Sequence, residues 1–176
     1  MFWKSLFQNR KTEFENDIIN INDHDKICLF EDILNKGLFL RVKVTGKSMA
    51  PFLNGGEIVS IKKVRPEILH TGDLIFFKNR SGQPILHRIM GRQKKFNIIL
   101  FQTKGDAFTA FDEPIPSSNI LGRVINIEKP DSAGKSRTLD MESIFWRIFN
   151  HIYATFQIIK SAVYYKVYLT LKRNRQ

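Results

Sequence analysis

One serine of this sequence stands where the chain is expected to turn. Ser48 lies in the stretch 45–51, between a strand-like run and the turn signal at residues 54–56. Gly46 tolerates the positive φ that a sharp bend requires, and Pro51 opposes helix and central-strand pairing. We therefore expect the Ser48 hydroxyl to point outward. That placement suits a nucleophile and equally suits an ordinary turn serine.

A histidine and two aspartates further along could activate such a serine. A serine hydroxyl becomes a useful nucleophile only when a nearby base accepts its proton, and imidazole does so near neutral pH. His87 lies in the apolar run 86–89, and Asp106 and Asp112 follow it. A carboxylate on the second ring nitrogen would orient such a base. Taken alone, His87 also fits a core or edge position of a strand, Asp106 an ordinary turn and Asp112 a surface acid.

The elements that must position these residues are short strands. Residues 27–36 predict a helix, with Leu29, Ile33 and Leu34 on one face. Residues 91–95 predict a connection. Close strand spacing with turn signals indicates a mainly β core of the sandwich or barrel type. The predicted strands cover residues 38–44, 57–63, 73–78, 84–90, 96–103 and 120–128.

The two ends of the chain differ from this core. Residues 1–26 carry polar residues without a period and predict a loosely ordered arm, and 130–140 predict a linker. In the tail, 141–176, apolar residues recur every three or four positions, which predicts one long amphipathic helix or two. Lysines and arginines interrupt its apolar runs, so we expect no membrane span. The stripe could pack on its own β domain or on a partner protein, or it could lie on a membrane surface. Its members are Ile144, Ile148, Ile152, Phe156, Ile159, Val163 and Val167.

Composition narrows the classes of function. The formal net charge of the 176 residues is +11, but the basic residues form scattered clusters, so we expect no nucleic-acid partner. Cys28 is the single cysteine, which rules out an intramolecular disulfide, and its apolar neighbours predict a buried side chain. His24, His70 and His151 lack partners at metal-ligand spacing, so we expect no metal site and no cofactor.

The ordered motifs resemble one family of peptidases. Gly46-x-Ser48-Met49-x-Pro51 is followed by motifs at residues 72–77 and 86–89, and then by residues 103–106 with an aspartate six positions on. In this order they resemble the signal peptidase I / LexA clan of serine peptidases, over residues 38–124. The resemblance implies a mainly β, coiled β-sheet fold of the LexA/signal peptidase type over residues 27–129, with the amphipathic helical tail added.

The resemblance also implies roles for individual residues. Ser48 matches the nucleophile, and His87 matches the base of the endoplasmic-reticulum and archaeal signal peptidases. Asp112 matches the triad acid, and Asp106 a supporting or structural acid. Gly46 stands where signal peptidases often carry a serine, as in the LexA-like branch, which leaves the second oxyanion donor open. Met49 is expected to face the substrate or the core.

We therefore expect a serine endopeptidase that cleaves a leader or precursor peptide with small side chains before the cut. The family usually carries a membrane anchor before the serine motif, and residues 1–26 lack an apolar run long enough for one. This favours a cytoplasmic protein whose tail could touch a membrane peripherally. Two alternatives stay open: a non-catalytic peptide-binding module of the same fold, and a LexA-like self-cleaving regulator. The latter would need a larger unit than residues 1–36.

Overall fold

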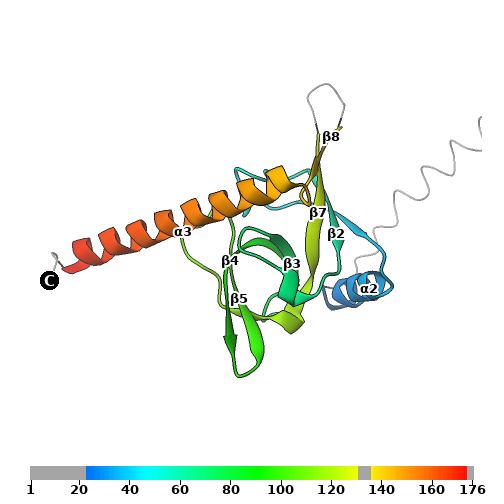
Figure 1. The fold of residues 1–176 in the computed structure, drawn as a ribbon, viewed down its shortest axis with the longest axis horizontal. Helices are drawn as coiled ribbons and strands as arrows, with labels where there is room; N and C mark the ends of the chain where they lie inside the picture. Colours follow the sequence, from blue (N-terminus) through cyan, green and yellow to red (C-terminus); the bar gives the residue numbers. More distant parts are fainter. Residues whose placement is uncertain (1–22, 131–135, 174–176) are drawn as a thin grey trace, which may run out of the picture.

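A computed structural model describes residues 23–130 and 136–173. It contains one antiparallel sheet of eight strands and two α-helices, as Figure 1 shows. The prediction of a mainly β fold with a helical tail is confirmed. The helices are α2 (Asp23–Asn35) and α3 (Ile144–Arg173), and the strands are β1 (Leu40–Lys43), β2 (Ile58–Lys62), β3 (Leu74–Lys78), β4 (Pro84–Lys95), β5 (Ile98–Lys104), β6 (Ile115–Pro116), β7 (Ile120–Pro130) and β8 (Ser136–Asp140).

The order of the strands places β3 in the middle of the sheet. The order is β1-β2-β7-β3-β4-β5-β6, and β8 pairs with β7. The β3 side chains are buried on both faces from Leu74 to Phe77. Phe76 belongs to a core cluster beneath α2, whereas Phe77 belongs to a second cluster with Phe101 on β5. A strand covered on both faces reads as a continuous apolar run rather than an alternating one, as the sequence Leu-Ile-Phe-Phe does here.

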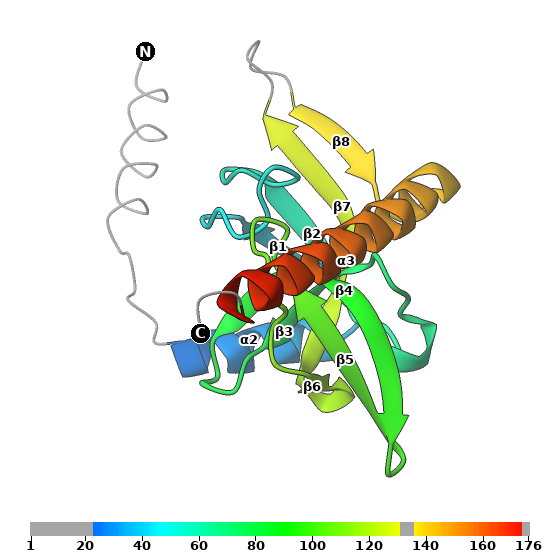
Figure 2. The same cartoon turned by 90° about the vertical axis from the view of Figure 1, so that its left-hand side faces the viewer.

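The connection predicted at residues 91–95 is wrong. Strand β4 continues to Lys95 and pairs with β5 through a turn at Phe96 and Asn97, both of which have positive φ. The resulting hairpin projects from the sheet, as Figure 2 shows. Its outer half is exposed, so no apolar alternation marks it in the sequence. Two-residue turns with positive φ usually carry glycine or asparagine, and the asparagine at position 97 was the available signal.

Four predictions need correction. Helix α2 begins at Asp23, so the expected arm is helical from there, while residues 1–22 lie outside the described part of the chain. Of the predicted apolar face, Leu34 is buried but Leu29 is 48% exposed, and Ile27 is buried in its place. Cys28 is exposed rather than buried, because it precedes Leu29 on the outward side of α2. The expected linker contains β8, which extends the pairing of β7.

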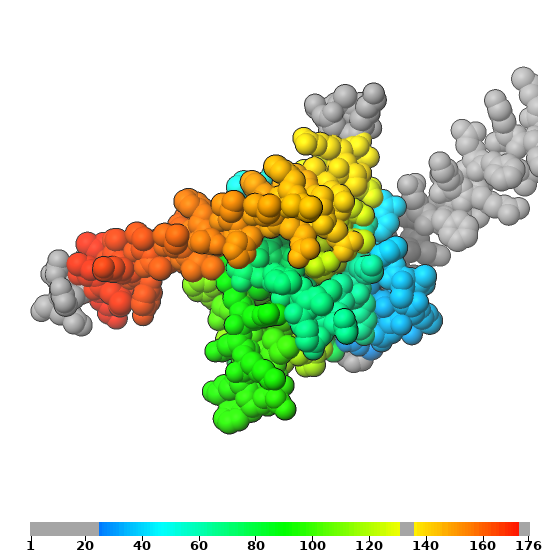
Figure 3. Space-filling model, in the orientation of Figure 1, coloured from blue at the N-terminus to red at the C-terminus, as the bar shows by residue number. Residues whose placement is uncertain are grey.

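Helix α3 is a single helix, and its orientation differs from one of the expectations. It crosses one side of the sheet and its C-terminal part extends beyond the body, as Figures 1 and 3 show. The residues that it buries are Asn150, Ala154, Gln157 and Ser161. The apolar stripe, in contrast, is exposed along its whole length. Packing of the stripe against its own β domain is therefore wrong. That contact is made by the opposite side of the helix, with its buried amides and with the aromatic rings that pack on Phe52.

Candidate active site

Ser48 lies in a compact turn between β1 and β2. The amide of Ala50 donates to the Lys47 carbonyl at 3.0 Å, and that of Leu53 donates to the Met49 carbonyl at 2.9 Å. The Met49 side chain is 1% exposed and belongs to the core cluster. The buried Met49 side chain thus anchors the turn to the core. The next residue back, Ser48, is half-buried and borders a cavity at the surface.

His87 is held on β4, where it pairs in register with Ile75 of β3. Its side chain is 7% exposed. The rings of Phe77 and Phe108 contact the imidazole edge-on, with centroid distances of 6.2 and 6.1 Å. These contacts hold the ring in one plane, so its two nitrogens face different neighbours.

The Nδ1 atom of His87 faces Asp112. The distance from Nδ1 to Asp112 Oδ2 is 2.7 Å, and the Thr103 hydroxyl donates to the same oxygen at 2.8 Å. The Asp112 amide donates to the Thr103 carbonyl at 2.9 Å, and the Gln102 side chain donates to the Asp112 carbonyl. The acid is therefore tied to β5 through both its backbone and its side chain. This arrangement can fix the Nδ1–H tautomer and leave Nε2 as a proton acceptor.

The charge of Asp112 is supported by its partners. Partial burial acts to raise the pKa of the Asp112 carboxyl. The hydrogen bond and charge interaction with His87 act in the opposite direction, as does the hydrogen bond from Thr103, and together they hold the pKa below its usual value. The lowered pKa favours the ionised form of Asp112, which can act as the counter-charge of a protonated His87.

Gly105 joins the serine turn to the histidine. A Cβ added at Gly105 would lie 2.7 Å from the Ser48 carbonyl oxygen and 2.9 Å from His87 Nε2. The Ala107 amide donates to the Ser48 carbonyl at 2.9 Å, which ties this loop to the turn. Glycine is therefore required at position 105 for the close approach of the two segments.

A cavity of about 690 Å³ opens beside these residues. Ser48 and His87 both line it, along with Gly46, Met49 and Phe108. Its remaining walls come from α2, β1, β2, β3 and the start of β4, and they are mostly apolar. Hydrogen bonds of the described residues link His87 to Asp112 but do not link the Ser48 hydroxyl to His87. The structure thus brings Ser48, Gly46, Met49 and His87 to one cavity, with Asp112 behind the histidine.

Asp106 has a different environment. Arg88 donates to both of its carboxylate oxygens, at 2.9 and 2.7 Å, and both side chains are fully buried. The guanidinium also donates to the Asn150 side chain of α3 at 2.7 Å. The rings of Phe52 and Tyr153 each lie 4.8 Å from it. Asp106 therefore supports the loop that carries Gly105, and it is occupied by Arg88 rather than by the imidazole.

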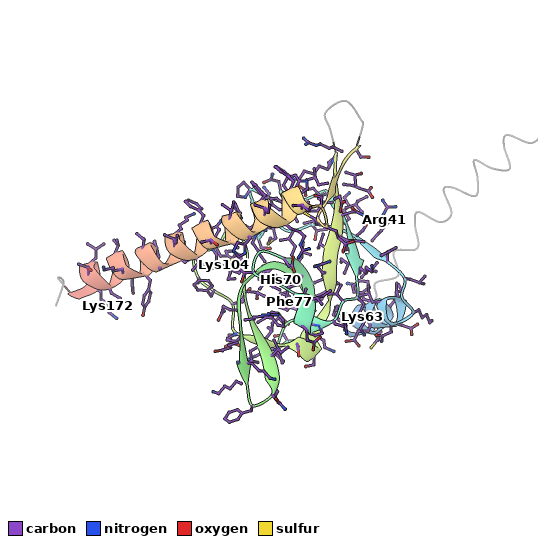
Figure 4. The ribbon with its side chains drawn as sticks, viewed as in Figure 1. Arg41, Lys63, His70, Phe77, Lys104 and Lys172 are labelled. Carbon is purple, nitrogen blue, oxygen red and sulfur yellow. The ribbon has the colours of Figure 1, made fainter. Side chains whose placement is uncertain are left out.

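Lys104 and Gln157 are further residues that the sequence did not single out. The buried Lys104 ammonium donates to the Phe108 carbonyl at 2.8 Å and to Gln157 Oε1 at 3.1 Å. Gln157 Nε2 in turn donates to the Asp106 carbonyl at 3.3 Å. Burial lowers the pKa of Lys104. Figure 4 shows Lys104 beneath α3, so the helix holds the loop that faces His87. A lysine before Gly-Asp and a glutamine on a helix give no sequence signal of this pairing.

The described ranges contain no group of three or more histidine, cysteine, aspartate or glutamate side chains that could hold a metal ion. Within the same ranges, neither helix combines the length and the apolar character that crossing a membrane requires.

Comparison with known proteins adds one similarity. No protein-family model matches the chain. Over 96 residues it is 30% identical to a protein named signal peptidase I W from Bacillus subtilis. The relationship is signal peptidase-like. The aligned part covers 53% of this chain and 50% of the relative, so the chain spans about half the length of the curated relative that it matches. This similarity supports a peptidase-like function in general terms.

Proposed function

We propose that the protein is a serine endopeptidase in which Ser48 is the nucleophile, His87 the base and Asp112 the acid that orients it. One observation carries the proposal. His87 is hydrogen-bonded through Nδ1 to Asp112, whose pKa is held below its usual value. On its other side, His87 Nε2 lies so near Gly105 that a Cβ there would come within 2.9 Å of it and within 2.7 Å of the Ser48 carbonyl oxygen. A histidine held in this way, beside a cavity that a serine lines, matches the division of roles in serine hydrolases.

The proposed chemistry uses this chain's own groups. Ser48 Oγ attacks the scissile carbonyl carbon while His87 Nε2 accepts its proton, and Asp112 stabilises the imidazolium. The Ser48 amide is the first donor to the oxyanion. When the tetrahedral intermediate collapses, the imidazolium returns the proton to the leaving amine and an acyl-enzyme remains. Water, deprotonated by His87, then releases the acid and regenerates Ser48.

We assign the apolar cavity to the substrate. Strand β1 is the outermost strand at one end of the sheet, and Val42, Val44 and Gly46 line the cavity next to it. An extended peptide can add to such an edge through main-chain hydrogen bonds, with pockets reading alternate side chains. Met49 forms part of the floor. A leader or precursor peptide with small residues before the cut is the proposed substrate. Its carbonyl would draw Ser48 and His87 into hydrogen-bond reach, because catalytic hydrogen bonds often tighten only when substrate binds.

The decisive test is cleavage of a mixed peptide library rich in small residues, read by mass spectrometry. We expect cuts by the wild-type protein that vanish in both Ser48→Ala and His87→Ala. Ser118→Ala and His70→Ala are matched controls, since both side chains are exposed and neither lines the cavity. Cuts that persist in the Ser48 and His87 variants would point to a contaminating protease. A folded protein that binds library peptides without cutting them would instead favour the non-catalytic binding module.

A further inference from the structure

The outer face of α3 is a continuous apolar surface. We define this outer face as the residues between Ile144 and Val163 that point away from the sheet. Each is between 57% and 78% exposed. At 1.5 Å per residue the face is about 29 Å long. Figure 3 shows α3 running along the surface of the molecule. The members of the outer face are Ile144, Phe145, Ile148, Ile152, Phe156, Ile159 and Val163.

The outer face cannot turn inward, because the opposite side of α3 is fixed to the catalytic body. Asn150 accepts a hydrogen bond from Arg88, and Gln157 accepts one from Lys104. Rotating the helix to bury the apolar face would leave both cations buried without these acceptors, which is unfavourable because a buried charged group needs its hydrogen-bond partners. The protein therefore presents the apolar face outward as part of its fold. A surface of this size usually marks an interaction site.

The charges of α3 indicate which surface it fits. No aspartate or glutamate occurs from Ile144 to Arg173, whereas Arg147, Lys160, Lys166 and Lys172 are exposed. The outer face also covers about 120° of the helix circumference at 100° per residue, which is wider than the narrow seam of a coiled coil. Two copies packed face to face would bring cations together with no acid on either helix to pair with them. A wide apolar face flanked by cations is typical of a helix lying in a lipid interface.

A groove beside the outer face adds a place for a negatively charged headgroup. It has a volume of about 370 Å³ and lies between α3 and the turn before β3. Arg147 lines it with His70 and His151, and His151 Nδ1 lies 3.3 Å from the Thr71 carbonyl. The groove also contains Asp73, whose carboxylate accepts the His70 amide at 2.9 Å. Ile144, Ile148 and Ile152 form its apolar side, so the groove opens directly onto the outer face.

We propose that the outer face of α3 docks on a lipid bilayer containing anionic headgroups, with the helix parallel to the surface. The apolar side chains enter the boundary between headgroups and acyl chains, by about 5–10 Å for helices of this kind. Arg147 and the flanking lysines contact the headgroups. Gln157 ties α3 to Lys104 and Asp106 at the end of β5, and Asn150 ties it to Arg88 on β4. The catalytic body is therefore carried on the membrane surface as one unit with the helix.

Vesicle co-sedimentation of the full chain tests this proposal. We expect binding to phosphatidylcholine vesicles that contain phosphatidylglycerol, and binding at least tenfold weaker to phosphatidylcholine alone. The double variant Ile152→Glu, Phe156→Glu should lose at least tenfold in binding. Its control is Phe96→Glu, which removes an even more exposed aromatic ring from the tip of the β4–β5 hairpin. Circular dichroism establishes that each variant is folded, since all three positions are exposed.

Three outcomes would overturn the proposal. The first is a wild-type protein that does not sediment with the anionic vesicles at low salt. The second is a double variant that binds as well as the Phe96→Glu control. The third is a lipid-free dimer, seen by analytical ultracentrifugation, that the double variant dissociates; this would assign the outer face to a second copy of the chain. Arg147→Gln, Lys160→Gln should remove the preference for anionic vesicles, and an unchanged preference would contradict the assignment of the headgroup contacts.

Discussion

Exchanging each aspartate of the site for asparagine should separate catalysis from support. Asp112 and Asp106 belong to the same sequence motif, but their partners differ. Asp112 accepts from His87 and is 27% exposed, whereas Asp106 accepts twice from Arg88 and is fully buried. Asparagine keeps the size of the side chain and removes the negative charge. Asp112→Asn should therefore lower the turnover rate, and Asp106→Asn should lower the stability.

The expected sizes follow from the two environments. A hydrogen bond to a charged group contributes about 1.5–3 kcal/mol, and each 1.36 kcal/mol is about tenfold in rate. Asp112→Asn should thus reduce kcat by about 10- to 150-fold, with little change in Tm. Removing one partner of a buried ion pair costs about 3–5 kcal/mol. For a chain of this length, that lowers Tm by about 6–20 °C.

The assay pairs cleavage kinetics with thermal unfolding on the same samples. Both variants and the wild type would be measured with a peptide identified in the library experiment, at a temperature well below each Tm. The Glu113→Gln variant is the control, because this neighbour of Asp112 is exposed and forms a salt bridge with the exposed Arg80. It should match the wild type in both measurements.

The opposite pattern would refute the assignment. If Asp106→Asn, while fully folded, lost as much activity as we expect for Asp112→Asn, and Asp112→Asn stayed active, Asp106 would be the triad acid. If both variants cut at the wild-type rate, the proposed role of a carboxylate behind His87 would be wrong.

The remaining predictions concern the loop between the histidine and α3. Gly105→Ala should destabilise the protein by about 1–3 kcal/mol and reduce cleavage, because its Cβ would lie 2.7 Å from the Ser48 carbonyl oxygen. The control is Gly91→Ala, where an added Cβ meets open space. Its free energy of unfolding, measured in urea, should stay within about 0.5 kcal/mol of the wild type. Gln157→Leu removes an acceptor of the buried Lys104 ammonium and should cost about 1–3 kcal/mol, and an unchanged Tm would contradict that contact. The pKa of Lys104 is lowered in the folded protein, so between that value and about 10.5 the unfolded chain binds more protons and stability rises with pH. Lys104→Met should lack this rise when unfolding free energies at pH 8 and pH 10 are compared with those of the wild type, and an identical slope would show that Lys104 does not titrate there.

Much of the sheet could be predicted from the sequence because local pattern and tertiary burial agree there. The β-branched run from Ile58 to Ile61 and the apolar run of β3 both form strands close to the predicted limits. The β4–β5 hairpin was missed at residues 91–95, since a strand whose two faces are both exposed carries no alternation. Cys28 was misplaced for a related reason: apolar neighbours indicate a burial tendency, but the angle around α2 decides which of them is covered.

In the candidate site, too, some residues could be predicted from the sequence and others could not. Ser48, His87 and the two aspartates could be singled out because motifs fix their spacing along the chain. Arg88, Lys104 and Gln157 could not, since Arg88 meets Asp106 from 18 residues away and Lys104 meets Gln157 from 53 residues away, in both cases only through the fold. The apolar stripe of α3 was located correctly, but its direction was not determined. A stripe shows that something must cover the helix and does not show what covers it, and here the domain contacts the opposite side instead.

The hydrogen bonds between α3 and the body also predict how these positions vary among related sequences. An apolar interface tolerates many exchanges of similar volume, so its positions can drift one at a time. The pairs 88–150 and 104–157 each join a buried cation to an amide acceptor on the helix. Loss of one member leaves the other buried and unpaired, so either change alone is disfavoured. Among relatives that keep α3, positions 104 and 157 should therefore vary together, and so should positions 88 and 150; in relatives without the helix, the residues at 88 and 104 should be of another kind.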